Sequence, residues 1–220
     1  MKVFIQHYPQ NIPYGGGNQF VLFFIEFLKK NNIEITFELD DNIDIIFVIN
    51  PFSGPLRKYG INNFIEYRKK NTHVKIVLRV NENDARKKTN HMDKMMCYAI
   101  KNSDQVIYIS TWLKNYYQKM FLVKHNVPEC VIDMACNSKI FYPVKNKTFS
   151  GRKIRIVTHH NSDNWMKGFD IYQEIDTWIS NSLDAKNKYE FIYIGNLNKD
   201  FVKSSTYNVP KTTIETCAEV

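Results

Sequence analysis

Hydrophobic residues in the first two thirds of the chain form short runs that alternate with longer stretches of helical periodicity. Several runs are apolar at nearly every position, which is typical of parallel strands covered by helices on both faces. The predicted strands are 3–7, 33–39, 43–49, 74–80, 105–109 and 131–135. The predicted helices lie near 18–31, 61–70, 90–102 and 111–120. This alternation predicts an α/β doubly wound domain.

The pattern changes near Pro143, where the polar segment PVKNKTFSGRK contains proline and glycine and suits a linker. A second alternation follows, with a strand at 153–158, the loop HHNSDNWMKG, a helix at 169–180 and a strand at 189–194. We therefore expect two α/β domains, the first at 1–143 and the second at 150–220. We expect the domain at 150–220 to be incomplete, because it yields only two or three strands.

Charge and composition bear on the partners and on the compartment. The formal net charge of +8 favours anionic partners, such as phosphorylated small molecules, acidic membrane surfaces or nucleic acid. Much of the excess lies in lysine pairs such as Lys29 and Lys30 at expected helix ends, where a cation complements the helix dipole without binding anything. A hydrophobic content of 44% excludes a disordered chain.

The cysteines favour a reduced protein without a metal site. None of Cys97, Cys130, Cys136 and Cys217 forms a CxxC pair, and no histidine has the spacing that would complete a zinc site. We also find no signal peptide and no apolar run of about 18 residues that could span a membrane. We expect a cytoplasmic protein.

Three consecutive glycines, Gly15, Gly16 and Gly17, follow the first predicted strand and open the first predicted helix. Backbone N–H groups at a helix N-terminus attract phosphate or carboxylate, and glycine allows the ligand to approach the backbone. The spacing is not GxGxxG, and no acidic residue clearly ends the second strand, so a dehydrogenase is disfavoured. The alternative is a flexible turn without a ligand.

The segment LRVNENDARKKTNH, residues 78–91, is a second candidate, because ligands of open α/β sheets bind at the carboxyl ends of strands. Its two carboxylates and two guanidinium groups could orient a hydroxylated substrate. The residues concerned are Arg79, Asn81, Glu82, Asn83, Asp84 and Arg86. The alternative is an ordinary charged loop, in which surface pairs of these residues contribute about 0–1 kcal/mol each.

The third candidate is the loop before the second domain's first helix. Lys167 and Gly168 come directly before that helix, so an ammonium group and a helix N-terminus converge and could neutralise a diphosphate leaving group. His159 and His160 end the preceding strand, with Asn161 next to them. Because neighbouring strand residues point to opposite faces, we expect one histidine at most to reach a ligand. A plain helix-start turn is the alternative.

These pieces, in this order, resemble glycosyltransferases of the GT-B fold, and most of all family 4, the group 1 type. The resemblance extends over nearly the whole chain and rests on PYGGGNQF, QVIYISTWLKNYY, VIDMACNSKIFYPV and MKGFDIYQEI. The third piece resembles the family segment that closes the first domain. The matching residues are Asn137, Phe141, Tyr142 and Pro143.

The resemblance implies two Rossmann-like domains, with the acceptor held mainly by the first and a nucleotide-sugar by the second. It implies a retaining sugar transfer to a hydroxyl group of a glycan, lipid or protein, without metal or cofactor. Glu82, Asp84 and Lys167 are then the catalytic candidates, and the acceptor-binding candidates are Arg79, Asn81, Asn83 and Arg86. The donor-binding candidates are Gly15, Gly16, Gly17, His159, His160, Asn161, Lys167 and Gly168.

The sequence departs from the family in three places. No arginine precedes Lys167 in HHNSDNWMK, no histidine lies in the loop from Asn81 to Asp84, and the family's pair of glutamates eight positions apart would fall after Val220. We therefore expect a fragment that is inactive alone.

The competing hypothesis is a non-catalytic module that binds a phosphorylated or glycan ligand. Nucleic-acid binding is disfavoured, while STWLKNYYQKMFLVKH leaves peripheral membrane contact open.

Overall fold

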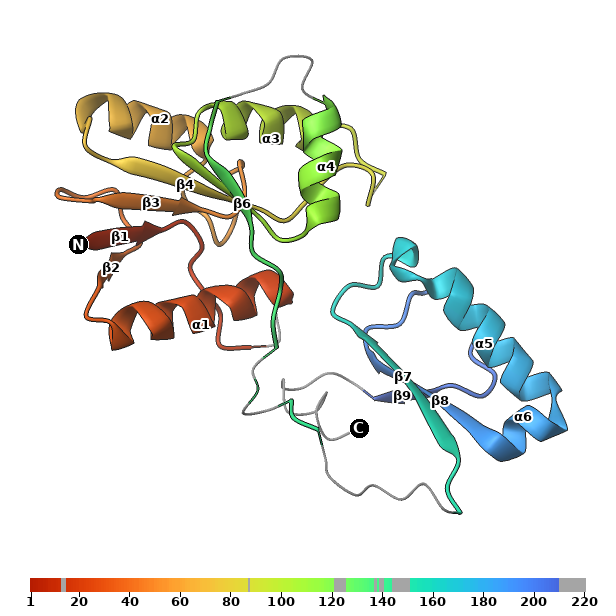
Figure 1. The fold of residues 1–220 in the computed structure, drawn as a ribbon. Helices are drawn as coiled ribbons and strands as arrows, with labels where there is room; N and C mark the ends of the chain where they lie inside the picture. The colour runs from red at the N-terminus through yellow and green to blue at the C-terminus, as the bar shows by residue number, and fades with distance from the viewer. Residues whose placement is uncertain are drawn as a thin grey trace. The chain divides into compact units, whose positions relative to one another are not determined.

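The computed structural model describes residues 1–12, 15–86, 88–120, 126–136, 138, 141–143 and 151–209. The chain divides into two compact units (Figure 1). The first consists of Met1–Pro9 and Gly16–Ala135, and the second of Gln10–Gly15 and Cys136–Val220. Each unit contains its own parallel β-sheet. Among the helices of the described segments, none is long and apolar enough to cross a membrane.

The first unit is built on a six-stranded sheet in the order β2-β1-β3-β4-β5-β6, in which every neighbouring pair is parallel. The strands are β1 (Lys2–Ile5), β2 (Glu34–Thr36), β3 (Ile45–Val48), β4 (Lys75–Val80), β5 (Gln105–Tyr108) and β6 (Glu129–Val131). The strand order reverses between β1 and β3. In open α/β sheets the ligand crevice lies at the carboxyl ends of the strands beside such a switch point.

Four helices cover the two faces of this sheet. They are α1 (Gly16–Lys30), α2 (Ile61–Lys70), α3 (Met92–Lys101) and α4 (Thr111–Met120). Helix α1 lies on one face, and α2 and α3 lie on the other (Figure 1). Strand β4 shows how the faces separate, because Ile76, Leu78 and Val80 join the core cluster of α2, α3 and α4, whereas Val77 packs with the α1 cluster. By the two-residue period of a strand, the side chain of Arg79 lies on the α1 face.

The second unit has a smaller sheet in the order β7-β8-β9, again parallel throughout. Its elements are β7 (Ile154–His160), the short 3-10 helix η1 (Trp165–Lys167), α5 (Phe169–Asn181), α6 (Leu183–Lys188), β8 (Tyr189–Gly195) and β9 (Tyr207–Val209). Helix α5 packs Phe169 against Tyr193 and Phe201, which forms a core cluster on one side of this sheet.

A buried carboxylate joins α5 to the segment that enters β9. Asp176 is fully buried and accepts hydrogen bonds from the backbone N–H groups of Ser204 (2.6 Å) and Ser205 (2.9 Å), and from the hydroxyl group of Thr206. Burial opposes the ionisation of Asp176, but these hydrogen bonds outweigh that effect and lower its pKa. The carboxylate therefore holds the β8–β9 connection against the helix.

The α/β class with parallel sheets is confirmed, and two predicted helices, 61–70 and 111–120, have the expected bounds. The last strand of the first sheet is present, but its predicted bounds, 131–135, are wrong, because β6 ends at Val131 where its partner β5 ends at Tyr108. Beyond that point Ile132 and Met134 are exposed. Helix α6 and strand β9 were not predicted, since three to six residues are too few to show a period.

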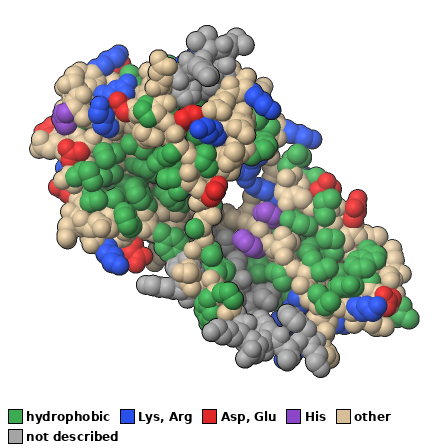
Figure 2. Space-filling model, in the orientation of Figure 1, with side chains coloured by type: hydrophobic (Ala, Val, Ile, Leu, Met, Phe, Trp, Pro, Cys, Tyr) green, Lys and Arg blue, Asp and Glu red, His purple; other side chains and the backbone are tan. Residues whose placement is uncertain are grey.

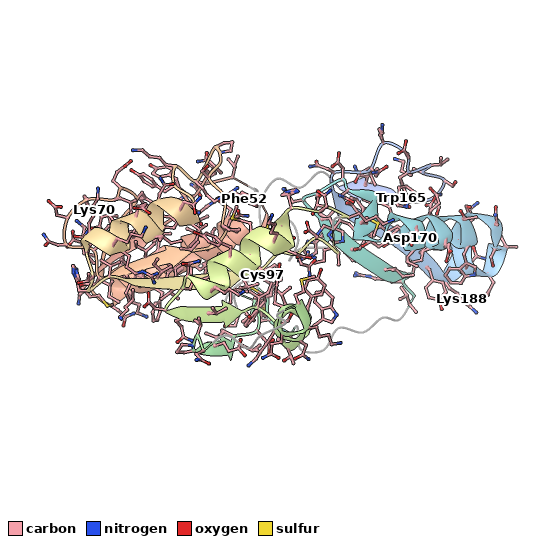
Figure 3. All side chains as sticks on the ribbon, turned by 90° about the horizontal axis from the view of Figure 1, so that it is seen from above. Phe52, Lys70, Cys97, Trp165, Asp170 and Lys188 are labelled. Atoms are coloured by element: carbon pink, nitrogen blue, oxygen red, sulfur yellow. The ribbon has the colours of Figure 1, made fainter. Side chains whose placement is uncertain are left out.

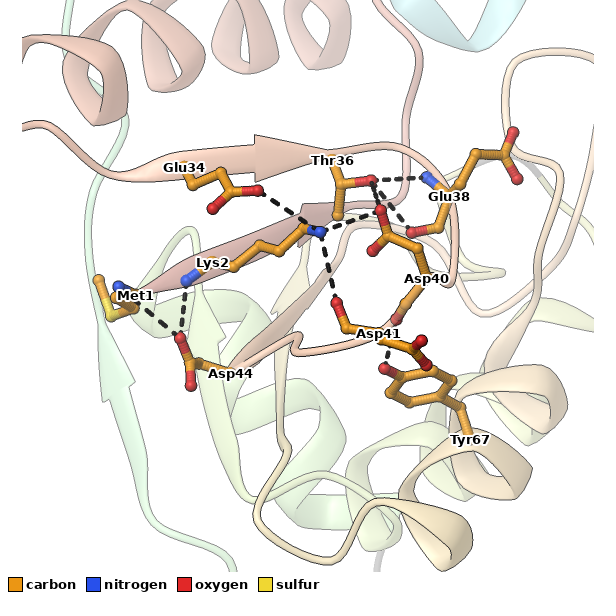
Figure 4. A network of polar contacts seen from close by, with 9 residues as sticks. All are labelled: Met1, Lys2, Glu34, Thr36, Glu38, Asp40, Asp41, Asp44 and Tyr67. Atoms are coloured by element: carbon orange, nitrogen blue, oxygen red, sulfur yellow. Dashed lines mark hydrogen bonds and ion pairs between the residues drawn. The ribbon is translucent and has the colours of Figure 1, made fainter.

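An ionic network holds the end of the first sheet at which the strands begin (Figure 4). The ammonium group of Lys2 lies 3.0 Å from a carboxylate oxygen of Asp40 and 3.4 Å from one of Glu34. Asp44 accepts a hydrogen bond from the backbone N–H of Lys2 at 2.7 Å. Tyr67 of α2 donates to the carbonyl oxygen of Asp40 at 2.6 Å. The network joins β1, the β2–β3 loop and α2.

A single amide ties the carboxyl ends of β1 and β3 together. Gln6 follows β1 and is buried. Its side-chain nitrogen donates to the carbonyl oxygens of Asn50 (2.7 Å) and Tyr59 (2.9 Å). Its side-chain oxygen accepts from the backbone N–H groups of Ile49 and Asn50, both at 3.0 Å. This one side chain therefore determines the path of the loop between β3 and α2.

We predict that Gln6→Ala lowers the free energy of unfolding by about 2–4 kcal/mol, because it leaves buried backbone donors and acceptors without partners. Chemical denaturation of the wild type and the variant measures the difference. The matched control is Gln118→Ala, which removes an exposed glutamine whose amide contacts Glu129, and its effect should stay below about 0.5 kcal/mol. Equal effects of the two substitutions would contradict the role assigned to Gln6.

Candidate functional site

The triple glycine lies where the sequence predicts it, at the entry to α1. Gly15 has a φ of 95°, a left-handed conformation that favours glycine, and the helix begins at Gly16. A Cβ atom added to Gly16 or Gly17 would meet no described heavy atom within 4 Å. The fold itself therefore requires glycine at position 15, whereas positions 16 and 17 leave open space beside the helix N-terminus.

A buried histidine next to this helix start was not predicted as a site residue. His7 is 4% exposed, and its Nε2 lies 3.3 Å from Oδ1 of the buried Asn18. Because Oδ1 only accepts, Nε2 carries the proton and Nδ1 is an acceptor, which has no hydrogen-bond partner among the described residues. Burial lowers the pKa of His7, and the charge of Arg57 acts in the same direction, against the contact with Asn18. The imidazole is therefore neutral at pH 7.

Arg79 is the most deeply buried charged side chain of the three candidate segments, with 4% of its surface exposed. Its Cζ lies 4.0 Å from the centroid of the Phe20 ring on α1, and Nη2 lies 3.0 Å from the sulfur of Met134. When the amide of Asn81 is turned so that both of its polar atoms find partners, its nitrogen donates to the carbonyl oxygen of Ile49 (3.0 Å) and its oxygen accepts from Nη1 of Arg79 (3.3 Å). Burial lowers the pKa of Arg79 to about 10, so the guanidinium remains charged at pH 7.

The loop after β4 is held by its own side chains. Oδ1 of Asn83 accepts from the backbone N–H of Arg86 at 2.9 Å, and Nδ2 of this buried residue has no partner among the described residues. The guanidinium of Arg86 is exposed and lies 3.5 Å from the carbonyl oxygen of Asn81. Neither Arg79 nor Arg86 forms an ion pair with Glu82 or Asp84 within the described part of the chain.

Asp84 has a clear structural task. Its carboxylate accepts from the backbone N–H groups of Met92 (3.0 Å) and Asp93 (2.9 Å) at the start of α3, and Asp93 accepts in return from the N–H of Asp84 at 3.0 Å. Burial opposes ionisation, but hydrogen bonds from Thr89 and from these N–H groups outweigh it, so the pKa of Asp84 is lowered. Asp84 therefore caps α3 as a carboxylate.

Glu82 is held by α4 through its backbone. Tyr117 donates its hydroxyl group to the carbonyl oxygen of Glu82 at 2.8 Å and also lies 3.0 Å from Oδ1 of Asp93. Burial raises the pKa of Tyr117 well above its usual range. Glu82 thus follows β4 at the sheet edge where the sequence places it, and Oε1 of its side chain is buried.

In the second unit, the two histidines at the end of β7 divide as predicted between the two faces of the strand. His160 lies with Nε2 at 2.9 Å from the hydroxyl group of Tyr172 on α5, which also lies 3.0 Å from Oγ1 of Thr158. His159 is exposed. His160 is the histidine that packs against the helix, which leaves His159 as the one that is accessible to solvent.

The loop from β7 to α5 is fastened by asparagines that follow β8. Asn196 donates to the carbonyl oxygen of Asn161 at 3.0 Å, and Asn198 donates to that of Asp163 at 2.6 Å. The loop ends in η1, whose last residue is Lys167, and Gly168 adopts a φ of 96° before α5 begins. The predicted order of lysine, glycine and helix is therefore present, on a loop that β8 supports.

Gly195 is another residue that sequence reasoning missed. It ends β8 with a φ of 127°, and a Cβ atom there would lie 1.9 Å from the carbonyl oxygen of His160. Only glycine allows the carboxyl ends of β7 and β8 to approach in this way. In the sequence, this residue is a glycine directly after the apolar run FIYI, a pattern that does not by itself distinguish a close strand approach from an ordinary turn.

A groove lies elsewhere, along α5. It encloses about 550 Å³ and is lined by Trp165, Asp170, Gln173, Glu174, Thr177, Trp178, Asn181 and Ser182. Trp165 belongs to η1 and Asp170 to the first turn of α5 (Figure 3). Hydrophobic side chains also gather over α5 and α6 (Figure 2), where Ile171, Trp178 and Leu183 are exposed. Because this groove is not at the strand ends, we do not place the chemistry there.

The other residues singled out in the sequence are the cysteines and the segment around Tyr142. Asn137 and Cys217 lie outside the described residues, and Tyr142 is exposed. Cys97, Cys130 and Cys136 are free thiols. Within the described segments, no group of three or more His, Cys, Asp or Glu side chains could hold a metal ion.

We predict that the free energy of unfolding falls as the pH drops from about 7 to 5, with a contribution from His7. The lowered pKa of His7 means that the unfolded chain binds the proton first, near its ordinary value of 6.5, so acid favours unfolding. His7→Gln should reduce this decline, and the surface control His73→Gln should leave it unchanged. Denaturant titrations across this pH range measure it. An unchanged decline in His7→Gln would contradict the assignment.

No protein-family model matches the chain, and no curated protein matches it in sequence. Among solved structures, the chain is similar to the sucrose-phosphate synthase from Thermosynechococcus elongatus, with a TM-score of 0.62 and 12% sequence identity. The similarity covers 99% of this chain and 72% of that one. At this level of identity the likeness concerns the fold alone. The chain has an α/β fold that is GT-B-like, with a six-stranded and a smaller parallel sheet.

Proposed function

We propose that this protein transfers a sugar from a nucleotide-sugar donor to a hydroxyl group of an acceptor, with retention of configuration and without a metal ion. The observation that carries the proposal is the loop between β7 and α5, where Lys167 and the left-handed Gly168 directly precede the helix N-terminus. The GT-B-like fold over 99% of the chain supports it. The first unit then holds the acceptor and the second unit holds the donor.

On the donor side, Lys167 and the N-terminus of α5 stabilise the negative charge of the departing diphosphate. This kind of electrostatic stabilisation needs donors that are fixed before the reaction, because reorienting them would cost free energy. The hydrogen bonds from Asn196 and Asn198 support the loop in that way. The open space beside Gly16 and Gly17 suits the donor phosphates or the transferred sugar. We assign His159 and Asn161, both exposed at the end of β7, to donor contacts.

Because Asp84 caps α3, the two catalytic candidates Glu82 and Asp84 are not equally suited to catalysis. A carboxylate that accepts the first N–H groups of α3 is poorly placed to exchange protons with a substrate. We therefore assign Asp84 to the support of the loop and Glu82 to the reacting sugar or acceptor hydroxyl. Arg79, Asn81, Asn83 and Arg86 remain our acceptor-binding residues.

We predict that Lys167→Ala lowers kcat/KM by the equivalent of about 2–4 kcal/mol. Steady-state kinetics with a panel of nucleotide-sugars measures the loss. Lys188→Ala is the control, because Lys188 lies at the other end of the α5–α6 segment and pairs with Asp184 on the surface. It should change kcat/KM little. Unchanged turnover in Lys167→Ala would rule out the proposed donor site.

The second candidate function is a non-catalytic module that binds a phosphorylated or glycan ligand. It is favoured by the contact of His160 with Tyr172, which commits that histidine to packing, and by the lack of an arginine shortly before Lys167. Calorimetry separates the two functions. Nucleotide-sugar binding that depends on Lys167, without turnover for any acceptor, would favour the binding module.

A further inference from the structure

We propose that Arg79 anchors an oxyanion subsite in the first unit, which receives a phosphate or carboxylate group of the acceptor. Only the identification of the ligand as the acceptor rests on the proposed function, because binding of an oxyanion at Arg79 can be measured without sugar transfer. Among the arginines of the described segments, Arg79 alone is buried. Its burial without a carboxylate is the observation that requires an explanation.

A buried charge is costly unless it is paired, and buried ion pairs normally supply the partner. Two arginines that are less buried do have a carboxylate partner. Arg68 lies 2.9 Å from Asp104, and Arg155 lies 2.6 Å from Glu190. Arg79 forms no ion pair with any described carboxylate. Its contacts are an aromatic ring, an amide oxygen and a thioether sulfur. None of these carries a negative charge, so the fold retains a cation that an anion from outside could neutralise.

Arg79 lies at the edge of the sheet where ligands of open α/β sheets bind, the carboxyl ends of the strands. It lies in β4 one residue before the strand ends at Val80. Asn81 joins it to Ile49 after β3, one of the two strands that flank the switch point. Its guanidinium also lies over Phe20 on α1, a helix without an acidic residue in its first turn. The guanidinium and the positive end of α1 thus lie on the same face of the sheet.

The contacts of the guanidinium indicate how an oxyanion would bind. Nη1 is oriented by Asn81, and the stacking on Phe20 fixes the plane of the group, which is what bidentate binding of an oxyanion requires. Nη2 contacts the sulfur of Met134, which is a weak acceptor on a side chain that is half exposed. A phosphate or carboxylate oxygen would replace this sulfur as a stronger partner. The subsite therefore selects an acceptor that carries a negative charge.

The test is thermal unfolding of the chain in inorganic phosphate, in acetate and in sodium chloride at equal ionic strength. We expect saturating phosphate to raise the midpoint of unfolding by about 5 °C relative to chloride. Arg79→Met should abolish this rise and should unfold at a higher temperature than the wild type in chloride, because it removes an unpaired buried charge. A purely structural arginine would instead give a less stable variant.

Two further variants separate this subsite from other sources of the effect. Arg68→Met removes an arginine that has a carboxylate partner, so it should lower the midpoint in chloride and keep the response to phosphate. Lys167→Ala should also keep the response. If Lys167→Ala loses it, the anion binds at the proposed donor site and the inference is wrong. If Arg79→Met does not fold, Arg79→Lys serves, and it should need at least tenfold more phosphate for half of the effect.

The remaining outcomes are also decisive. A response to phosphate but not to acetate indicates a phosphorylated acceptor, and a response to both indicates that carboxylates are accepted too. The absence of any response in the wild type, or an equal response in Arg79→Met, overturns the inference. Neither result affects the proposed sugar transfer, which the turnover of Lys167→Ala tests separately.

Discussion

The first unit depends on the amide of Gln6 at the place where the strand order reverses. The chain leaves β1 and β3 in opposite directions along the sheet. Backbone N–H and C=O groups at the carboxyl ends of these two strands therefore lack hydrogen-bond partners within the sheet. Gln6 supplies two donors and two acceptor positions at that point, and its bonds to Ile49, Asn50 and Tyr59 satisfy these groups. An apolar side chain of the same size could fill the space but could not satisfy them. The path of the chain at the switch point between β1 and β3 therefore depends on one satisfied amide.

The fold was largely predictable from the sequence, because the buried strands and amphipathic helices repeat their pattern over enough residues. Strand 74–80 is an example, since its apolar residues belong to both faces of the sheet. The limits of β6 could not be predicted, because the end of β5, and not the local sequence, determines where pairing stops. Strand β9 has three residues, and its entry is held by the carboxylate of Asp176 on a distant helix. Such tertiary contacts leave no periodic signal.

The candidate site was predictable to a different degree. The glycines at the start of α1 and the lysine before α5 lie as the sequence indicates, because strand, turn and helix follow one another locally. The tasks of Asp84 and His160 were not visible, since each depends on a partner that folding brings close, the N–H groups of α3 and the hydroxyl group of Tyr172. The surroundings of Arg79 were invisible for the same reason. The sequence places Glu82 and Asp84 within five residues of it, yet neither forms an ion pair with it in the described part of the chain.

The ionic network around Lys2 makes the two ends of the first sheet respond differently to salt. Where β1 and β3 begin, the chain is held by charges, because Lys2 lies beside Asp40 and the N-terminal ammonium group lies beside Asp44. Salt screens such pairs at the surface. Where the strands finish, the neutral amide of Gln6 holds the chain through hydrogen bonds. A rise in ionic strength therefore loosens the beginning of the strands and leaves their carboxyl ends unchanged.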